Sequence, residues 1–269
     1  MTTDSTLNVA TIALDIAPGR VDDNLAAAGR ALQMLEPDTD LVVLPELFTT
    51  GYIGDPHTME RLAQTNGGTA MSTLAALASQ YNMAIAGSFL ACTGRHYYNR
   101  GFIIEPSGDE TFYDKRHLFS LSTEARLYTA GTSARPIVRF RGWNISMMVC
   151  YDLRFPVWAR NSAQAYDLML VPANWPHARA YVWEHLLVAR AIENQACVIG
   201  ANRSGTDDYG VYDIGSYIFD AMGNNVGRRL SRRSAPAPIF TARLSLAEVR
   251  EARKRLPAGD CADNFSLMF

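Results

Sequence analysis

Short apolar runs rich in β-branched residues alternate along the chain with stretches whose apolar residues recur at helical spacing. The pattern predicts strands at Leu7–Leu14, Leu41–Pro45, Ala84–Phe89, Asn99–Ile104, Glu110–Tyr113, Pro136–Phe140, Trp143–Val149, Leu168–Pro172, Cys197–Ala201, Ser216–Asp220 and Ile239–Leu244. It predicts helices at Val21–Leu35, Thr69–Gln80, Val157–Gln164, Ala178–Asn194 and Leu246–Arg255, and loops at Thr49–Pro56 and Leu118–Gly131. Turn signals at Pro106-Ser107-Gly108 and Arg141-Gly142 predict two hairpins. Strands and helices that alternate in this way are typical of a layered α/β protein.

Two apolar strands in different halves of the chain resemble each other. Asp40-Leu-Val-Val-Leu-Pro-Glu46 and Asp167-Leu-Met-Leu-Val-Pro-Ala173 each follow a predicted helix. Chance could produce this similarity, since apolar strands look alike. The similarity also suits a fold of two similar halves whose strand ends face one cleft. No linker or low-complexity tract interrupts the 269 residues, so we expect residues 1–269 to form a single domain.

Composition and charge narrow the classes of partner. The formal net charge of −2 gives no reason to expect nucleic acid or an anionic membrane as a partner. The polar start, Met1 to Asn8, lacks the apolar block of a secretory signal, and no apolar run approaches the ~20 residues that span a bilayer. These features predict a soluble cytoplasmic protein. The four cysteines are far apart and form no Cys-x-x-Cys pair, which argues against a zinc site or a thioredoxin-type motif.

Three residues whose side chains could take part in a reaction lie at the ends of predicted strands. Cys150 follows the strand that starts at Trp143, Glu46 follows Leu-Val-Val-Leu-Pro, and Lys115 follows a hairpin. Each has an ordinary explanation when taken alone, since a cysteine is commonly a packing residue and a glutamate or lysine after a strand commonly faces water. The carboxyl ends of strands in α/β sheets are, however, where ligands usually bind.

A cysteine nucleophile needs help that the other two residues can supply. A free thiol has a pKa of about 8.5, so a base must take its proton or a cation must stabilise the thiolate. Glu46 is a candidate base, with a pKa that partial desolvation would raise, and Lys115 is a candidate cation and oxyanion donor. His117 offers an alternative cysteine–histidine pairing.

Three ordered motifs resemble the Glu-Lys-Cys signature of the nitrilase, or carbon-nitrogen hydrolase, superfamily. They are Pro45-Glu46-Leu47-Phe48, Tyr113-Asp114-Lys115-Arg116-His117-Leu118-Phe119 and Cys150-Tyr151-Asp152-Leu153-Arg154-Phe155-Pro156. The resemblance continues through Ala173-Asn174-Trp175-Pro176 and Arg190-Ala191-Ile192-Glu193-Asn194-Gln195. Within the superfamily the motifs are most similar to the bacterial omega-amidases, which hydrolyse the terminal amide of 2-oxoglutaramate and 2-oxosuccinamate.

The resemblance implies a fold, an assembly and a set of roles. The fold is an α-β-β-α sandwich that pairs into an α-β-β-α-α-β-β-α homodimer, through the helices after Cys150 and at Ala178–Asn194, and no cofactor or metal is needed. Cys150 is implied as nucleophile, Glu46 as general base, and Lys115 as stabiliser of the tetrahedral intermediate together with the backbone N–H of Tyr151. Glu124, in the loop after the lysine, is implied as a further catalytic glutamate that helps to hold the amide nitrogen.

Residues next to these motifs are candidates for binding the substrate. Arg154 can hold a substrate carboxylate through two parallel hydrogen bonds, or it can fix its own loop by pairing with Asp152 or a backbone carbonyl. Asn174 and Trp175, at the end of a predicted strand, are expected to line the pocket.

Three functions remain open on these grounds. The first is an amidohydrolase that converts a small keto-acid amide into the acid and ammonia through a cysteine thioester. The second keeps the Glu-Lys-Cys chemistry but acts on another aliphatic amide, a nitrile or an N-carbamoyl amino acid. The third is a non-catalytic module that binds a small acid in the same cleft.

Overall fold

Two β-sheets form the centre of the protein in a computed structural model that describes residues 5–213, 215–230, 235, 237–263 and 265–267. The larger sheet has seven strands in the order β13 (Arg228–Arg229), β14 (Ile239–Ser245), β1 (Thr6–Ile12), β2 (Leu41–Val43), β3 (Ala84–Thr93), β4 (His96–Ile104) and β5 (Glu110–Asp114). The smaller has five, in the order β12 (Tyr217–Phe219), β9 (Cys197–Asn202), β8 (Leu168–Ala173), β7 (Trp143–Met147) and β6 (Ile137–Phe140).

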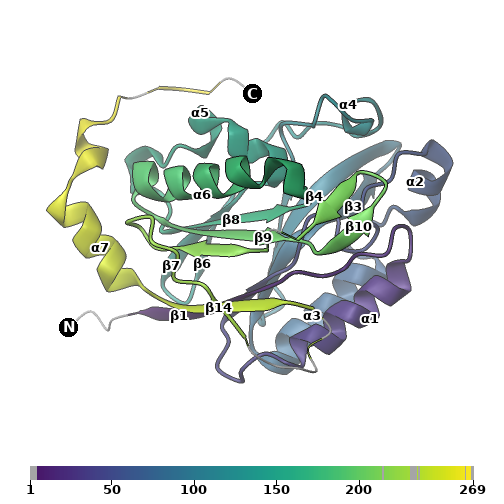
Figure 1. The fold of residues 1–269 in the computed structure, drawn as a ribbon, viewed down its shortest axis with the longest axis horizontal. Coiled ribbons are helices and arrows are strands. Elements are labelled where there is room, and N and C mark those ends of the chain that lie inside the picture. The colour runs from purple at the N-terminus through teal and green to yellow at the C-terminus, as the bar shows by residue number, and fades with distance from the viewer. Residues whose placement is uncertain (1–4, 214, 231–234, 236, 264, 268–269) are drawn as a thin grey trace.

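Helices cover the outer face of each sheet (Figure 1). The apolar faces of α1 (Val21–Leu32) and α3 (Thr69–Tyr81) share a buried cluster with the larger sheet. The helix α6 (Ala180–Asn194) shares a second buried cluster with the smaller sheet. The short helix α5 (Pro156–Ala159) lies on the same side of that sheet as α6. A third cluster, which includes Val43, Trp143, Met147 and Ile199, fills the space between the two sheets. The layers therefore run α-β-β-α, as predicted.

Burial on both faces explains why the central strands read as continuous apolar runs. β2 is hydrogen-bonded in parallel to β1 and β3, and β8 is parallel to β7 and β9. Every residue of β2 and of β8 is buried. Strands covered on both sides lose the polar alternation that marks a half-exposed strand.

The predicted helix Val157–Gln164 is wrong beyond Ala159. The helix α5 is a single turn, and a 3-10 turn at Ser162–Gln164 follows with Ala163 and Gln164 at positive φ. The Asn161 side chain explains the break, because it exchanges hydrogen bonds with the backbone of Tyr166 in place of helical bonds. Asparagine side chains commonly compete with the helix in this way.

Several elements were not predicted. The loop expected at Thr49–Pro56 leads into α2 (Pro56–Leu62), which begins at an Asp55 N-cap whose side chain accepts from the Thr58 N–H. The loop expected at Leu118–Gly131 contains the helical turn α4 (Glu124–Leu127). The short hairpin of β10 (Gly205–Asp207) and β11 (Gly210–Tyr212) gave no clear pattern. The last helix, α7 (Leu246–Arg255), has the predicted bounds.

No helix in the described part of the chain has the length and the apolar character that crossing a bilayer requires. The residues Met1 to Asp4, part of the polar start, lie outside the described residues.

Candidate functional site

The two similar strands, β2 and β8, end side by side at the site. The N–H of Glu46, three residues past β2, lies 3.5 Å from the carbonyl oxygen of Ala173 at the end of β8. The next N–H along, that of Asn174, donates to Glu46 Oε2 at 2.8 Å. The similarity in the sequence thus corresponds to two strand ends, one from each sheet, that meet at the same cleft.

Backbone conformation at two positions turns the chain sharply at this cleft. Cys150 has φ +46° where the segment after β7 enters a 3-10 helix, η1 (Cys150–Arg154), and Leu47 has φ +47° directly after Glu46. Residues other than glycine rarely adopt such backbone angles, and those that do are concentrated at functional sites. The Leu47 turn is held by its N–H, which donates to the buried Ser88 hydroxyl at 2.8 Å.

Lys115 follows β5 and lies between two buried carboxylates. Its Nζ is 2.8 Å from Glu46 Oε1, 2.8 Å from Glu124 Oε1 and 3.0 Å from Glu124 Oε2. Burial by itself lowers the pKa of this lysine. The nearby charges of Glu124 and Glu46 together raise it by more than burial lowers it, so the pKa lies well above its usual value. The ammonium group is therefore charged throughout the physiological range.

Asn99, on β4, joins the two carboxylates and was missed by sequence reasoning. Its Nδ2 donates to Glu46 Oε1 at 2.7 Å and to Glu124 Oε1 at 3.1 Å. Its Oδ1 accepts a hydrogen bond from the Ser88 hydroxyl at 2.9 Å. Asn99 is fully buried, and the network fixes the orientation of Glu46 from the side opposite Asn174. A single asparagine inside an apolar strand gave no signal of this role.

The thiol of Cys150 is neutral at physiological pH. Burial raises its pKa, the Glu46 carboxylate raises it further, and Lys115 lowers it by less, so the pKa lies well above the usual value. Hydrogen bonding to Glu46 is a further cause that raises the pKa of the thiol. Of the two ways to activate a cysteine, this arrangement fits proton transfer to a neighbouring base and not a thiolate held by a cation.

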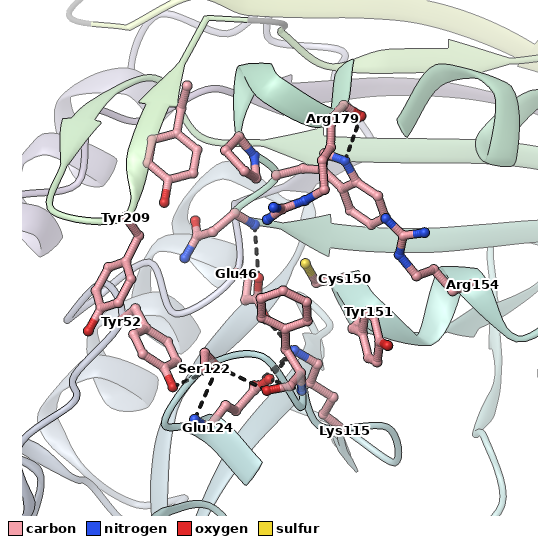
Figure 2. Close-up of a pocket in the computed structure, with 15 residues that line it drawn as sticks. Glu46, Tyr52, Lys115, Ser122, Glu124, Cys150, Tyr151, Arg154, Arg179 and Tyr209 are labelled. Carbon is pink, nitrogen blue, oxygen red and sulfur yellow. Dashed lines mark hydrogen bonds and ion pairs between the residues drawn. The ribbon is translucent and has the colours of Figure 1, made fainter. Parts of the chain in front are cut away.

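These groups lie at the base of a pocket, where Cys150, Glu46 and Lys115 converge, with Tyr52 and Tyr209 on one side and Arg154 on the other (Figure 2). The cavity of about 100 Å³ suits a small molecule. It is lined by Glu46, Tyr52, Lys115, Phe119, Ser122, Glu124, Cys150, Tyr151, Arg154, Asn174, Trp175, Pro176, Arg179, Tyr209 and Tyr212. All eight residues that the sequence singled out for catalysis or substrate binding are among them.

The polar groups of this wall include donors and acceptors without protein partners. The Tyr151 N–H donates no backbone hydrogen bond within the described chain. The Asn174 Oδ1 is buried and has no partner among the described residues. A buried acceptor left unpaired is costly in a protein interior, and a ligand N–H would satisfy this one.

Arg154 is not paired with Asp152, which was the alternative to a role in substrate binding. Its guanidinium lies 5.1 Å from the ring centroid of Trp175. Asp152 is instead held by the Tyr113 hydroxyl at 2.7 Å and by His117 Nδ1 at 2.7 Å. His117 therefore braces η1 against the segment that carries the lysine, and it is not among the residues that line the pocket.

Several lining residues were not singled out from the sequence. Tyr52, Ser122 and Phe119 lie in segments that were expected to be loops, while Arg179, Tyr209 and Tyr212 come from near α6 and from the β10–β11 hairpin. Tyr52 contacts Tyr209 edge-to-face, with ring centroids 4.8 Å apart. Aromatic residues in a Gly/Pro-rich loop directly after a candidate base were the only available signal.

No group of three or more histidine, cysteine, aspartate or glutamate side chains in the described residues is placed to hold a metal ion. The two glutamates of the site both pair with Lys115.

Comparison with known proteins gives consistent matches over most of the chain. The carbon-nitrogen hydrolase family matches residues 8–254. The chain is 44% identical to the omega-amidase YafV of Escherichia coli K12 over 85% of this chain and 86% of that protein. It is 32% identical to a 2-oxoglutaramate amidase of Bacillus subtilis over 94% of this chain and 96% of the relative. The crystal structure of XC1258 from Xanthomonas campestris, a CN-hydrolase superfamily protein with an arsenic adduct in its active site, superposes with a TM-score of 0.89 at 35% identity, covering 98% of this chain and 99% of that one.

Proposed function

Because the chain belongs to the carbon-nitrogen hydrolase family and is an amidase of that family, we propose that it hydrolyses the terminal amide of a small keto-acid amide, 2-oxoglutaramate or 2-oxosuccinamate. The observation that carries the proposal is the convergence of Cys150, Glu46 and the charged Lys115 at the base of one small pocket, with Lys115 Nζ 2.8 Å from Glu46. The substrate class is supported by the names of the two relatives and by the arginine on the pocket wall.

The first half-reaction forms a thioester. Glu46 takes the proton of the Cys150 thiol as the sulfur attacks the amide carbon, and negative charge develops on the amide oxygen. The Tyr151 N–H and the Lys115 ammonium stabilise that oxygen. Glu46 then returns the proton to the amide nitrogen, the carbon–nitrogen bond breaks, and ammonia leaves.

The second half-reaction returns the free enzyme. A water molecule gives a proton to Glu46 and attacks the thioester carbon, and the same two donors stabilise the second tetrahedral intermediate. The carbon–sulfur bond breaks, the sulfur regains its proton from Glu46, and the carboxylic acid product is released.

Lys115 contributes mainly its charge in this scheme. Three carboxylate oxygens already lie within hydrogen-bonding distance of its Nζ, so a directed hydrogen bond to the oxyanion must compete with Glu46 and Glu124. Glu124 acts by holding the ammonium in place. Its Oε2 also accepts from the Phe119 N–H at 2.6 Å, which anchors the glutamate to the loop at the pocket wall.

Substrate binding is assigned to the polar groups of the opposite wall. Asn174 Oδ1 is the acceptor for the amide N–H groups of the substrate, and the Arg154 guanidinium binds its carboxylate. Trp175 supports Arg154 through the face of its ring.

An ammonia-release assay tests the proposal across 2-oxoglutaramate, 2-oxosuccinamate, simple aliphatic amides, nitriles and N-carbamoyl amino acids. We expect the highest kcat/KM for a keto-acid amide, and a loss of at least about 10³-fold in Cys150→Ala and Cys150→Ser with unchanged circular dichroism. Turnover by Cys150→Ala at the wild-type rate would exclude the mechanism. Activity on a carbamoyl compound with none on any keto-acid amide would exclude the substrate class alone, and ammonia from no compound would favour a binding module.

A further inference from the structure

Two arginines of the pocket have guanidinium groups that no acceptor in the described part of the chain uses. The Cζ of Arg154 lies 5.1 Å from the Trp175 ring centroid, and the Cζ of Arg179 lies 5.3 Å from the Phe119 ring centroid. Neither side chain forms an ion pair or donates a hydrogen bond within the described residues. Each guanidinium has five N–H donors in a fixed planar arrangement. The wall of the pocket therefore presents two sets of donors for a ligand.

The charges of the pocket are not balanced. Its lining includes three cations, Lys115, Arg154 and Arg179, against two carboxylates, Glu46 and Glu124. Both carboxylates are within 2.8 Å of Lys115, so that cluster carries a net charge of −1, and the two arginines leave the pocket as a whole with a net charge of +1. A ligand that carries negative charge away from the amide is favoured by this distribution, and one that carries positive charge there is disfavoured.

Arg179 is held in position by its backbone and by one aromatic ring. It ends a 3-10 turn, η3 (His177–Arg179), and its carbonyl oxygen accepts from Trp175 Nε1 at 2.9 Å. Its guanidinium extends to Phe119, which belongs to the loop after Lys115, so the side chain joins two separate parts of the pocket wall. The residue is exposed.

Trp175 links the two arginines. The face of its ring contacts the Arg154 guanidinium, and its indole N–H fixes the backbone of Arg179. The two cations are thereby arranged around one rigid, buried side chain, which is 3% exposed. Positioning by a rigid group reduces the entropy lost when a ligand is bound.

We propose that Arg179 is a specificity-determining residue that, together with Arg154, selects amides with a carboxylate at the far end and rejects those with an ammonium group beside that carboxylate. A 2-oxo acid offers carboxylate and carbonyl oxygens, all of them acceptors, to the two guanidinium groups. An α-amino acid amide such as glutamine brings a positive charge to the same place. The inference rests on the proposed function, because it explains how the same site separates a keto-acid amide from its amino-acid counterpart.

Four five-carbon amides separate the contributions. Glutaramate has the far carboxylate, 2-oxoglutaramate adds the oxo group, L-glutamine has an ammonium group in its place, and pentanamide has none of these. For Arg179→Met we expect the ratio of kcat/KM for glutaramate to that for pentanamide to fall about 10- to 100-fold, the range that a charge-assisted hydrogen bond supports. The loss should appear in KM, since the contact exists in the ground state.

Conservative and control variants identify the cause. Arg179→Lys keeps the charge without the planar donors, so it should retain the discrimination against glutamine and recover only part of the glutaramate preference. Arg179→Met should lose part of both. Arg30→Met, which removes an exposed arginine of α1 on a different face, should leave all four rates as in the wild type.

Binding provides a readout without turnover. In a Cys150→Ala background, calorimetry with the product 2-oxoglutarate should give a Kd about 10- to 100-fold higher when Arg179→Met is added. An unchanged Kd together with an unchanged glutaramate-to-pentanamide ratio would overturn the role of Arg179, while a wild-type preference for glutaramate would leave the proposed function standing. A wild type that uses glutaramate no better than pentanamide would instead overturn the substrate class, and this inference with it.

Discussion

Replacing Lys115 with methionine would remove the ammonium group while keeping most of the buried side-chain volume. Lys115 is 2% exposed, and its Nζ is 2.8 Å from both Glu46 and Glu124. Without it, the two buried carboxylates would share the amide group of Asn99 and keep one backbone N–H donor each, from Asn174 and Phe119, with no cation beside them. Two neighbouring buried carboxylates cannot both remain ionised at low cost, so one of them is expected to take up a proton.

The cost of that proton sets the size of the effect. Protonating a glutamate whose unfolded pKa is about 4.3 costs about 1.4 kcal/mol for each pH unit above that value, hence roughly 3.7 kcal/mol at pH 7 and about 1 kcal/mol at pH 5. This agrees with the 3–5 kcal/mol, roughly, that follows when one partner of a buried ion pair is removed. For a domain of this size, about 2–4 °C of Tm is lost per kcal/mol, so we expect a Tm lowered by roughly 7–15 °C at pH 7 and by about 2–4 °C at pH 5.

The sign of the pH dependence follows from which groups titrate. The pKa of Lys115 is raised, so its own contribution to stability is fully present below about pH 10.5 and is lost only as the pH rises through the still higher folded pKa. Between pH 5 and 8 the contribution of Lys115 to the stability of the wild type is therefore constant. The pH dependence of the difference comes from the protonated carboxyl of the variant, which binds more protons than the unfolded chain does.

Thermal unfolding of the wild type, Lys115→Met and Lys115→Met/Glu124→Gln at pH 5, 6, 7 and 8 measures this. The double variant has one carboxylate fewer and should regain most of the lost stability at pH 7. A Tm difference that is the same at every pH, or a double variant less stable than Lys115→Met, would refute the electrostatic explanation. Cys150→Ala serves as the control, since it changes the site without changing its carboxylates.

Two further predictions concern Asn99 and the assembly. Asn99→Leu removes the donor that orients Glu46, so kcat should fall about 10- to 100-fold with a smaller change in KM, and Asn99→Asp, which adds a third carboxylate, should be worse; an Asn99→Asp enzyme faster than Asn99→Leu would contradict this role. The homodimer stays a prediction, supported by the exposed apolar side chains of Val157 and Tyr181, 54% and 73% exposed on the two helices expected to pair. Size-exclusion chromatography at micromolar concentration should give about twice the monomer mass for the wild type and a lower mass for Tyr181→Glu. A monomeric wild type would count against the pairing.

The sequence predicted the order of strands and helices because periodicity is a local property. The strand β8, predicted one residue short, and the helix α7, predicted with its observed bounds, have their own apolar spacing and could be identified without knowledge of the fold. The helix predicted at Val157–Gln164 was wrong beyond Ala159 because Asn161 forms hydrogen bonds with Tyr166 and with Asn194. The second of these partners is 33 residues away in the sequence. A tertiary contact of that kind leaves no periodic signal.

The site shows the same division. The motifs around Glu46, Lys115 and Cys150 predicted the candidate reactive groups, since each follows a strand in a recognisable pattern, and the structure brings the three into one pocket. Their electrostatic states were not readable from the sequence. Whether the thiol is neutral or ionised depends on the balance between burial, Glu46 and Lys115, which is fixed by distances between segments far apart in the chain.

What the sequence determined by itself, then, was the order of the elements, the family and the identity of the three side chains proposed to react. Only the tertiary structure decided that Asn99 orients Glu46, that Asp152 is held by His117 and not by Arg154, and that Arg179 faces the pocket. The physical reason is that hydrogen bonds and charges act over a few ångströms in space. Residues that are remote in the sequence come within that range only when the two sheets pack together.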